Sequence, residues 1–524
     1  AGPPGPELEG VPWSLKVPVP KAYLALGARI PQAELRAITL EQLNELAAVV
    51  KAVLPKMEVI DSRTGVRVTW ETVNLYQIDP YFVRPVTLRF KSSFVELVAH
   101  GPQVADASGR NRAKVGKLFV SHWWGTPFCQ TLALLNFHAK CRNLPHTTAY
   151  WMCTFANNQH DLSDLATPDL SQTPFVKALM SPDCVGTVAL LDSEVNTLKR
   201  VWCVLENYVS TTWVRSKDEY HYYDVAAWLA DGLGTYGGKP VPAKPTLRMD
   251  LGAGKSAGMV EDEETGGAFP AGVSERGIRV DVAQAEASQE QDLRQILHCI
   301  AGTDGQGPPP SACEGYDKVN ANARKLFAPG AFQLAALEGK QEKLEALLAE
   351  FPDQVNDGIA DGATPLHAAA WKGRLEVLAR LLAAGADPDR RKGDGCTALF
   401  QPAQAGKVEV IEALLSGRAD PNLAREDGVS PIFIAAQCDR AGAVAALAAG
   451  GADADRATAK GATPLIVAAQ MGHLHVVRAL LEGKADPNLA SASGSVPLSV
   501  AKKPDVVKAL KQAGAQPLAR PPPG

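Results

Sequence analysis

Three segments that directly follow apolar runs carry the aromatic and polar side chains best suited to binding a ligand. The segments are 122–126, 156–161 and 192–199, and the apolar runs before them are 117–121, 150–155 and 185–191. Ligands of a parallel sheet bind beyond the carboxyl ends of its strands, so we expect these segments to lie at one edge. Their indole rings could stack on a ligand, and their amides could donate hydrogen bonds. The predicted ligand-binding residues are His122, Trp123, Trp124, Gly125, Asn157 and Asn158.

Each of these residues also has a purely structural interpretation. Trp123 and Trp124 could cap a core at the end of a strand instead of contacting a ligand. His122 and His160 stand alone without metal-ligand spacing, which favours a structural role for both and predicts no metal site. The polar side chains of residues 157–161 could simply stabilise a turn. Both interpretations stay open for this edge of the sheet.

Two other kinds of site are disfavoured by the sequence. The nine cysteines are scattered without a Cys-x-x-Cys pair, so neither a zinc site nor a disulfide framework is indicated. Reduced thiols of this kind are typical of the cytosol and the nucleus. The segment Gly252–Ser256 imitates a phosphate-binding loop, but Met249 stands where that loop requires glycine and no apolar strand leads into it. We therefore interpret this segment as an ordinary loop.

The elements that would position the candidate residues follow from the pattern of apolar side chains. Apolar runs separated by helical patterns indicate an α/β domain whose parallel sheet is covered on both faces. Ahead of it, a helix is predicted over 40–54, with a capping box from Thr39 and Gln42, and short strands over 66–70 and 86–90. The predicted organisation is an N-terminal extension (1–115), an α/β domain (116–301) with a flexible insertion (232–272), a linker (302–324), a repeat array (325–516) and a Pro-rich tail (517–524).

A tetrapeptide pattern returns every 33 residues in the C-terminal third of the chain. Its copies begin at Thr364, Thr397, Ser430, Thr463 and Val496. The period and the Thr-Pro-Leu-His sequence of the first copy resemble the ankyrin repeat, which implies an all-α solenoid with an atypical first repeat. A solenoid offers an extended concave surface, so we expect a protein partner there. The residues expected to be buried between repeats are Leu366, Leu399, Ile432, Leu465 and Leu498.

Two motifs of the α/β domain point to a second family. The first strand ends in Phe119–Ser121, and a Trp-Cys-x-x-Glu motif, Trp202–Glu206, lies on the helix after the third strand. On these motifs, residues 116–210 resemble a Toll/interleukin-1 receptor (TIR) domain. In enzymatic members of that family the motif glutamate is essential for cleaving the nicotinamide–ribose bond of NAD⁺. The resemblance implies Glu206 as the catalytic residue and NAD⁺ as a substrate with no separate cofactor. Trp202 is predicted as a further substrate-binding residue.

The wider region 90–300 is similar to ankyrin-linked proteins predicted from microalgal protists. The shared motifs are 121–125, 150–153, 157–160 and 202–206. This similarity implies a common domain order but carries little about function. The loop 157–172 and the insertion 232–272 depart from the enzymatic TIR pattern. A structural interpretation therefore stays open here too, with Trp202 in a core and Glu206 on a solvated helix surface.

Charge and hydropathy restrict the remaining partners. Lys and Arg total 53 against 57 Asp and Glu, which gives a formal net charge of -4 and predicts no nucleic acid or anionic membrane partner. No apolar run reaches membrane-spanning length. These features favour a cytoplasmic protein, with the nucleus as the alternative. The chain begins with Ala1 and not with Met, so a targeting signal ahead of it stays open.

Two hypotheses of function follow from the sequence. In the first, partner binding by the ankyrin array controls a TIR-like signalling domain that hydrolyses NAD⁺ and can associate with itself. In the second, the protein is a non-enzymatic adaptor whose α/β domain is only an assembly module. The environment of Glu206 discriminates between them. A carboxylate that lines a cleft with Trp124 and Asn157 favours the enzyme, and one that points to bulk solvent or is sealed by packing favours the adaptor.

Overall fold

The computed structural model describes most of the chain in two compact units, residues 1–327 and 328–524. We call them the first unit and the repeat unit. The described residues are 30, 32, 36–88, 91–98, 117–157, 169–192, 194–214, 221–228, 235–236, 239–240, 245–249, 258–260, 271–287, 290–303, 306–358 and 362–517. Among them, no helix combines the length and the apolar composition needed to cross a membrane.

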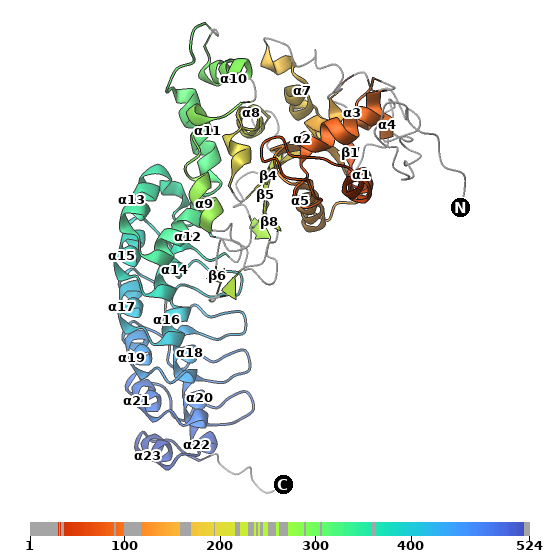
Figure 1. The fold of residues 1–524 in the computed structure, drawn as a ribbon. Helices are drawn as coiled ribbons and strands as arrows, with labels where there is room; N and C mark the ends of the chain where they lie inside the picture. Colours follow the sequence, from red (N-terminus) through yellow and green to blue (C-terminus); the bar gives the residue numbers. More distant parts are fainter. Residues whose placement is uncertain are drawn as a thin grey trace, which may run out of the picture. The chain divides into compact units, whose positions relative to one another are not determined.

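A mixed sheet of seven strands organises the described part of the first unit, in the order β1-β3-β2-β4-β5-β8-β9. Figure 1 labels β1, β4, β5 and β8 of this sheet. Its strands are β1 (Ile38–Thr39), β2 (Lys117–His122), β3 (Ala149–Trp151), β4 (Cys184–Leu191), β5 (Tyr222–Trp228), β8 (Pro245–Met249) and β9 (Gly258–Val260). The four central strands β3, β2, β4 and β5 are parallel to one another, and the outer three pair antiparallel. The predicted parallel arrangement of 118–121, 150–155 and 186–191 is confirmed. The second of these strands is shorter than predicted, because Cys153–Ala156 form the short helix α6.

The segment predicted as a flexible insertion contains strands. Within 232–272, β8 and β9 extend the main sheet, and β6 (Thr235–Tyr236) pairs with β7 (Lys239–Pro240). The Gly- and Pro-rich composition of this segment did not predict them. The edge strand β9 can be short because only one of its sides must pair.

Residues that precede the central strands in the chain also form helices, and these helices pack on the sheet. Helix α1 (Leu40–Val53) begins at the predicted capping box, in which the Thr39 hydroxyl accepts from the Gln42 backbone N–H and the Gln42 side chain accepts from the Thr39 backbone N–H. The strands predicted over 66–70 and 86–90 are wrong for the residues that the structure describes. Residues 89–90 lie outside the described residues. Arg67 forms only an isolated bridge with Ile60, and residues 75–87 are helical, as α2 (Leu75–Ile78), a π-helical turn (Asp79–Val83) and α3 (Arg84–Thr87). A second capping box, formed by Asn74 and Gln77, starts this helical segment.

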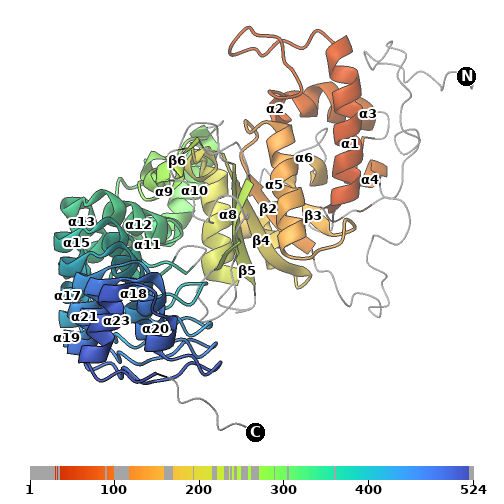
Figure 2. The same cartoon turned by 90° about the horizontal axis from the view of Figure 1, so that it is seen from below.

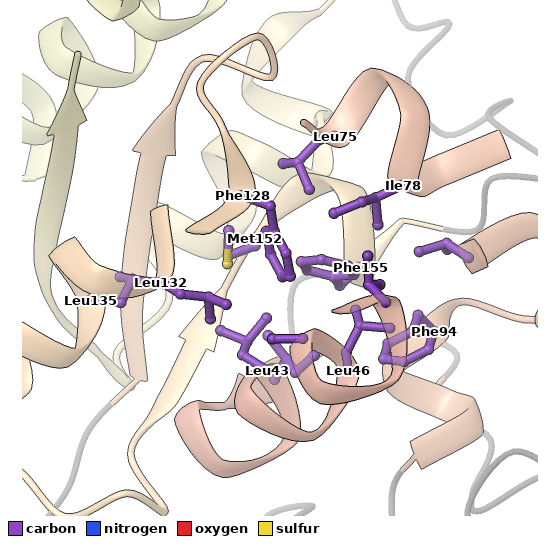
Figure 3. Packing of buried hydrophobic residues seen from close by; sticks show 14 of the residues in the cluster. Leu43, Leu46, Leu75, Ile78, Phe94, Phe128, Leu132, Leu135, Met152 and Phe155 are labelled. Carbon is purple, nitrogen blue, oxygen red and sulfur yellow. The ribbon is translucent and has the colours of Figure 1, made fainter. Parts of the chain in front are cut away.

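The first unit has a hydrophobic core on each face of its sheet, because successive apolar side chains of a strand point to opposite faces. On one face, α1 and α5 (Phe128–Cys141) pack with the helices of residues 75–98 over the sheet (Figure 3). That cluster includes Leu43, Leu46, Leu75, Ile78, Phe94, Phe128, Leu132, Leu135, Met152 and Phe155. On the other face lie α7 (Pro174–Met180), α8 (Val201–Tyr208), α10 (Glu290–Ala301) and α11 (Glu314–Lys325). Residues 38–98 thus share a core with the sheet, and α11 lies within the predicted linker.

Six helix pairs stack in the described part of the repeat unit (Figure 1). They are α12 (Ala328–Glu338) with α13 (Gln341–Glu350), α14 (Pro365–Lys372) with α15 (Leu375–Ala383), α16 (Phe400–Ala405) with α17 (Val408–Ser416), α18 (Pro431–Gln437) with α19 (Ala441–Ala449), α20 (Pro464–Met471) with α21 (Leu474–Glu482), and α22 (Pro497–Val500) with α23 (Pro504–Gln512). The first helices contact one another in one column and the second helices in another, seen from below in Figure 2. Four of the five core positions are buried as predicted, namely Leu366, Leu399, Ile432 and Leu465. Leu498 is only partly buried, because the last described pair has no following pair to cover it.

Candidate functional site

Glu206 lies inside the first unit and not on a solvated surface. It belongs to α8, whose neighbouring residues Val204 and Leu205 pack into the core beside the sheet. The residue is 5% exposed, and its Oε2 accepts a hydrogen bond of 2.6 Å from the Oγ of Ser121 near the end of β2. Helices α10 and α11 cover α8 from its other side. A helix that is covered on both sides buries residues all round, which explains the position of this carboxyl group.

Burial controls the protonation of Glu206. Removal from water raises the pKa of its carboxyl group to about 8, and hydrogen bonds with Ser121 and Cys203 offset only part of this shift. The carboxyl group is therefore mostly neutral at pH 7. A neutral carboxyl group costs much less to bury than a carboxylate, so the site is compatible with a packed interior.

Two cysteine thiols lie close to Glu206. The Sγ of Cys203 is 3.5 Å from the backbone oxygen of His122, and the Sγ of Cys153 accepts from the indole Nε1 of Trp124 at 3.1 Å. Burial, reinforced by the charge of Glu206, raises the pKa of both thiols, that of Cys153 to about 12. Both thiols stay protonated at neutral pH, so neither has the thiolate character of a nucleophile.

His122 is also buried and neutral. Its Nδ1 is 3.3 Å from the backbone oxygen of Val120, and within the described residues its Nε2 has no hydrogen-bond partner. Burial lowers the pKa of the imidazole to about 4. The ring can neither hold a charge at pH 7 nor act there as a general acid in its cationic form. Among the described residues, its unpartnered nitrogen, like the unpartnered hydroxyl oxygen of Thr126 in the same segment, is a buried polar atom that packing alone does not explain.

The aromatic residues predicted to bind a ligand take part in packing. Trp124 packs against the cluster that contains α1 and α5, with its ring 5.8 Å from that of Tyr76. The ring of Trp123 lies over Gly125 so closely that an added Cβ atom would fall 2.2 Å from it, which makes glycine necessary there. Trp202 stacks on Phe175 at 5.0 Å between ring centroids.

The other predicted residues divide between packed and undescribed positions. The indole Nε1 of Trp202 donates to Asp292 at 3.0 Å, which fixes its ring between α7 and α10. Asn157 is buried at the end of α6. Asn158 and His160 lie outside the described residues. The structure thus brings Glu206, Ser121 and the two thiols together, and it holds the partly buried Trp202 between α7 and α10.

A buried charged network that the sequence did not predict lies beneath α5, on the opposite face of the sheet from Glu206. Asp224, in the middle of the apolar strand β5, is fully buried. Its carboxylate accepts from Arg142 through two hydrogen bonds, of 2.8 and 2.5 Å, and lies 2.9 Å from the Nε2 of His138. The Nδ1 of His138 is 3.4 Å from the hydroxyl of Tyr150. An acidic residue within an apolar run was the available signal, since buried charges are almost always paired.

Stability is expected to depend on pH through Glu206. Its ordinary pKa of 4.5 rises to about 8 in the folded chain, so the folded chain binds more protons than the unfolded chain between these values. The free energy of unfolding should therefore fall as the pH rises through this window. Glu206→Gln removes the titrating group, so the variant should lose less stability over the same window. Urea denaturation followed by tryptophan fluorescence at several pH values measures both curves, and curves of equal slope would contradict the assignment.

Within the described residues, no cluster of three or more His, Cys, Asp or Glu side chains is arranged to hold a metal ion. Comparison with known families identifies the repeat region. A family model described as ankyrin repeats matches residues 311–392, 332–425, 378–458, 399–491 and 432–520 in overlapping stretches. No match was found among curated proteins. The repeat unit therefore consists of ankyrin repeats, whereas no family match supports the TIR resemblance of residues 116–210.

Proposed function

We propose that the ankyrin repeats hold a protein partner and that the first unit is a non-enzymatic assembly module, so that the whole protein acts as an adaptor. The observation that carries the second part is the packing of Glu206. Its side chain is 5% exposed and bound by Ser121, and both thiols beside it are protonated. A carboxyl group that must stabilise positive charge on a ribose has to face that sugar in its ionised form. The described geometry offers neither condition at pH 7.

The partner-binding part of the proposal rests on the surface of the repeat unit. We call the surface made by α14, α16, α18 and α20 the first-helix face. Each of these helices presents one large exposed side chain at the same place in its repeat, namely Trp371, Gln404, Gln437 and Gln470. None of these four is needed for the core, since the core positions lie elsewhere on the same helices. A regular row of exposed aromatic and amide groups suits contact with a partner.

We further propose that the first unit has a TIR-like fold. Support comes from the order of its parallel strands. The four parallel strands follow one another along the chain as β2, β3, β4 and β5. Across the sheet their order is β3-β2-β4-β5. This is the doubly wound order with a switch point between β2 and β4, where such sheets bind ligands or partners. Self-association of the first unit would serve the adaptor function.

NAD⁺ hydrolysis is the second candidate function, and two observations favour it. Glu206 has a strongly shifted pKa and lies beside the carboxyl end of β2, next to the switch point. The unpartnered Nε2 of His122 lies at the same end of that strand. Hydrolysis would require α8 to move away from β2, so that Glu206 loses its bond to Ser121 and meets a substrate.

The two functions differ in the products formed from NAD⁺. The adaptor proposal predicts that the purified full-length chain releases no more nicotinamide from NAD⁺ than its Glu206→Gln variant does. The measurement is chromatography of the reaction mixture, with and without an identified partner. Nicotinamide release that Glu206→Gln abolishes, while the folded fraction stays unchanged, would make the hydrolase the better assignment.

A further inference from the structure

Basic residues recur at the turn between the two helices of each repeat. Arg374, Lys407, Arg440 and His473 stand 33 residues apart, each directly before a second helix. The Nε of Arg374 donates to the Leu337 oxygen at 3.2 Å, and that of Arg440 donates to the Gln404 oxygen at 3.1 Å. The Nζ of Lys407 donates in the same way to the Trp371 oxygen. These bonds hold each positive charge at the carboxyl end of the preceding first helix.

Within the described residues, most of the basic side chains at this place are not held in ion pairs, although Glu376, Glu409 and Asp439 stand within two residues of them. In the part of the chain that the structure describes, Arg374, Lys407 and Arg440 form no ion pair, whereas His473 lies 3.5 Å from Asp439. The exposed side chain of Lys372 adds another positive charge, 4.2 Å from the ring of Trp371. Partial burial and then the charges of Lys372 and Arg374 lower the pKa of Lys407. Like charges are thus crowded along one edge of the array.

Two large apolar side chains flank the same turn. Trp371 is 50% exposed and Leu375 is 38% exposed, although both types are usually covered. They stand at the two ends of the segment that carries Lys372 and Arg374. Exposed tryptophan and arginine side chains side by side are the composition that dominates binding energy at protein interfaces.

We propose that this basic edge, formed by Trp371, Lys372, Arg374, Leu375, Lys407 and Arg440, binds an acidic segment of the protein partner. The segment lies extended along the array, with its carboxylates at the basic side chains and an apolar side chain on Trp371. The positive charge of the basic edge complements the negative charge of an acidic segment, which is why we choose this class of partner. The inference rests on the proposed partner-binding function and names the chemical class of the partner.

The spacing of the charges favours a protein segment over a nucleic acid. Neighbouring packed helices lie about 8–10 Å apart, so successive basic side chains of the edge are separated by a similar distance. An extended peptide advances about 3.3–3.6 Å per residue, so acidic residues at every third position match this spacing. Phosphates on one strand of a duplex follow one another about every 3.4 Å, and each is charged, so basic groups about 8–10 Å apart would leave most of them unpaired.

A labelled peptide tests the proposal directly. The probe is an extended, fluorescein-labelled peptide with glutamate at every third position and one phenylalanine. The protein is the full chain, and binding is followed by fluorescence polarisation at low ionic strength. Lys372→Glu is compared with Lys508→Glu, which makes the same charge change at an exposed position of the second helix α23. Lys372 donates no hydrogen bond to the backbone in the described structure, so its variant is expected to fold normally.

The proposal predicts that the peptide binds, that Lys372→Glu weakens binding about tenfold, and that Trp371→Ala weakens it by a similar factor. Lys508→Glu should change the affinity less than twofold, or about 0.4 kcal/mol. Equal losses for Lys372→Glu and Lys508→Glu, or no binding at all, would overturn the proposal. Displacement of the peptide by a single-stranded oligonucleotide of equal charge would overturn it in favour of a nucleic acid. If the peptide does not bind while a partner still crosslinks to Gln437 on the first-helix face, only this inference is wrong and the adaptor proposal stands.

Discussion

Replacing Asp224 with alanine is expected to lower the free energy of unfolding of the first unit by about 3–5 kcal/mol. The substitution removes the common partner of Arg142 and His138, both of which reach it from α5. Asp224 is fully buried, and Arg142 is mostly buried with 19% of its side chain exposed. Without the carboxylate, a guanidinium group would remain in the interior with no compensating charge from β5. An uncompensated buried charge costs more than the pair itself gains.

Urea denaturation followed by tryptophan fluorescence measures this effect in the first unit. Eight of the nine tryptophans precede residue 328, so the fluorescence reports mainly on that unit. Glu290→Ala is the matched control, because it breaks an exposed ion pair with Arg294 of 2.9 Å. We expect a change below about 0.5 kcal/mol from the control. A loss below about 1 kcal/mol for Asp224→Ala would contradict a supporting role for the network.

Leu465→Ala is expected to cost the repeat unit about 2–5 kcal/mol. Leu465 is 0% exposed in α20, which packs against α18, α21 and α22. A smaller side chain there leaves a cavity between repeats, and neighbouring repeats cannot close it without breaking their own stacking. The loss should spread along the stack, because each repeat is stabilised mainly by its neighbours.

Hydrogen exchange of the amides in α18 to α21 locates this loss. We expect faster exchange in these helices for Leu465→Ala and unchanged exchange in the first unit. Met471→Ala is the matched control, because Met471 lies on the same helix with 48% of its surface exposed. It should change stability by less than about 0.5 kcal/mol. Equal effects of the two substitutions would contradict the assignment of Leu465 to the inter-repeat core.

The repeats could be predicted from the sequence because their determinants are local. Each repeat places the same apolar residue in the same environment, so the 33-residue period reports directly on packing. The capping box at Thr39 was likewise predictable, since both of its partners lie within one helical turn. The central strands β2, β3 and β4 could be predicted because strands covered on both faces are mostly apolar. The fourth central strand, β5, was not predicted, and it carries the charged Asp224 in its middle.

The remaining features depend on contacts between distant residues. The strand β1 pairs with β3 more than a hundred residues later, and no local pattern contains that information. His138 and Asp224 meet across a separation of 86 residues. Glu206 could be singled out by its motif, but its burial could not be predicted. The covering helices α10 and α11 come from a later part of the chain, so the helix carrying Glu206 looks half-exposed when it is considered alone.

The most direct test of the adaptor function is site-specific crosslinking from the full-length chain. A photoreactive amino acid is placed at Gln437 on the first-helix face or at Lys508 on α23, both exposed. The crosslinked products formed in extracts of the source cells are identified by mass spectrometry. The adaptor function predicts that one partner polypeptide is crosslinked from Gln437 and not from Lys508. Crosslinking of the same polypeptide from Lys508 alone, or equally from both positions, would contradict partner binding on the first-helix face.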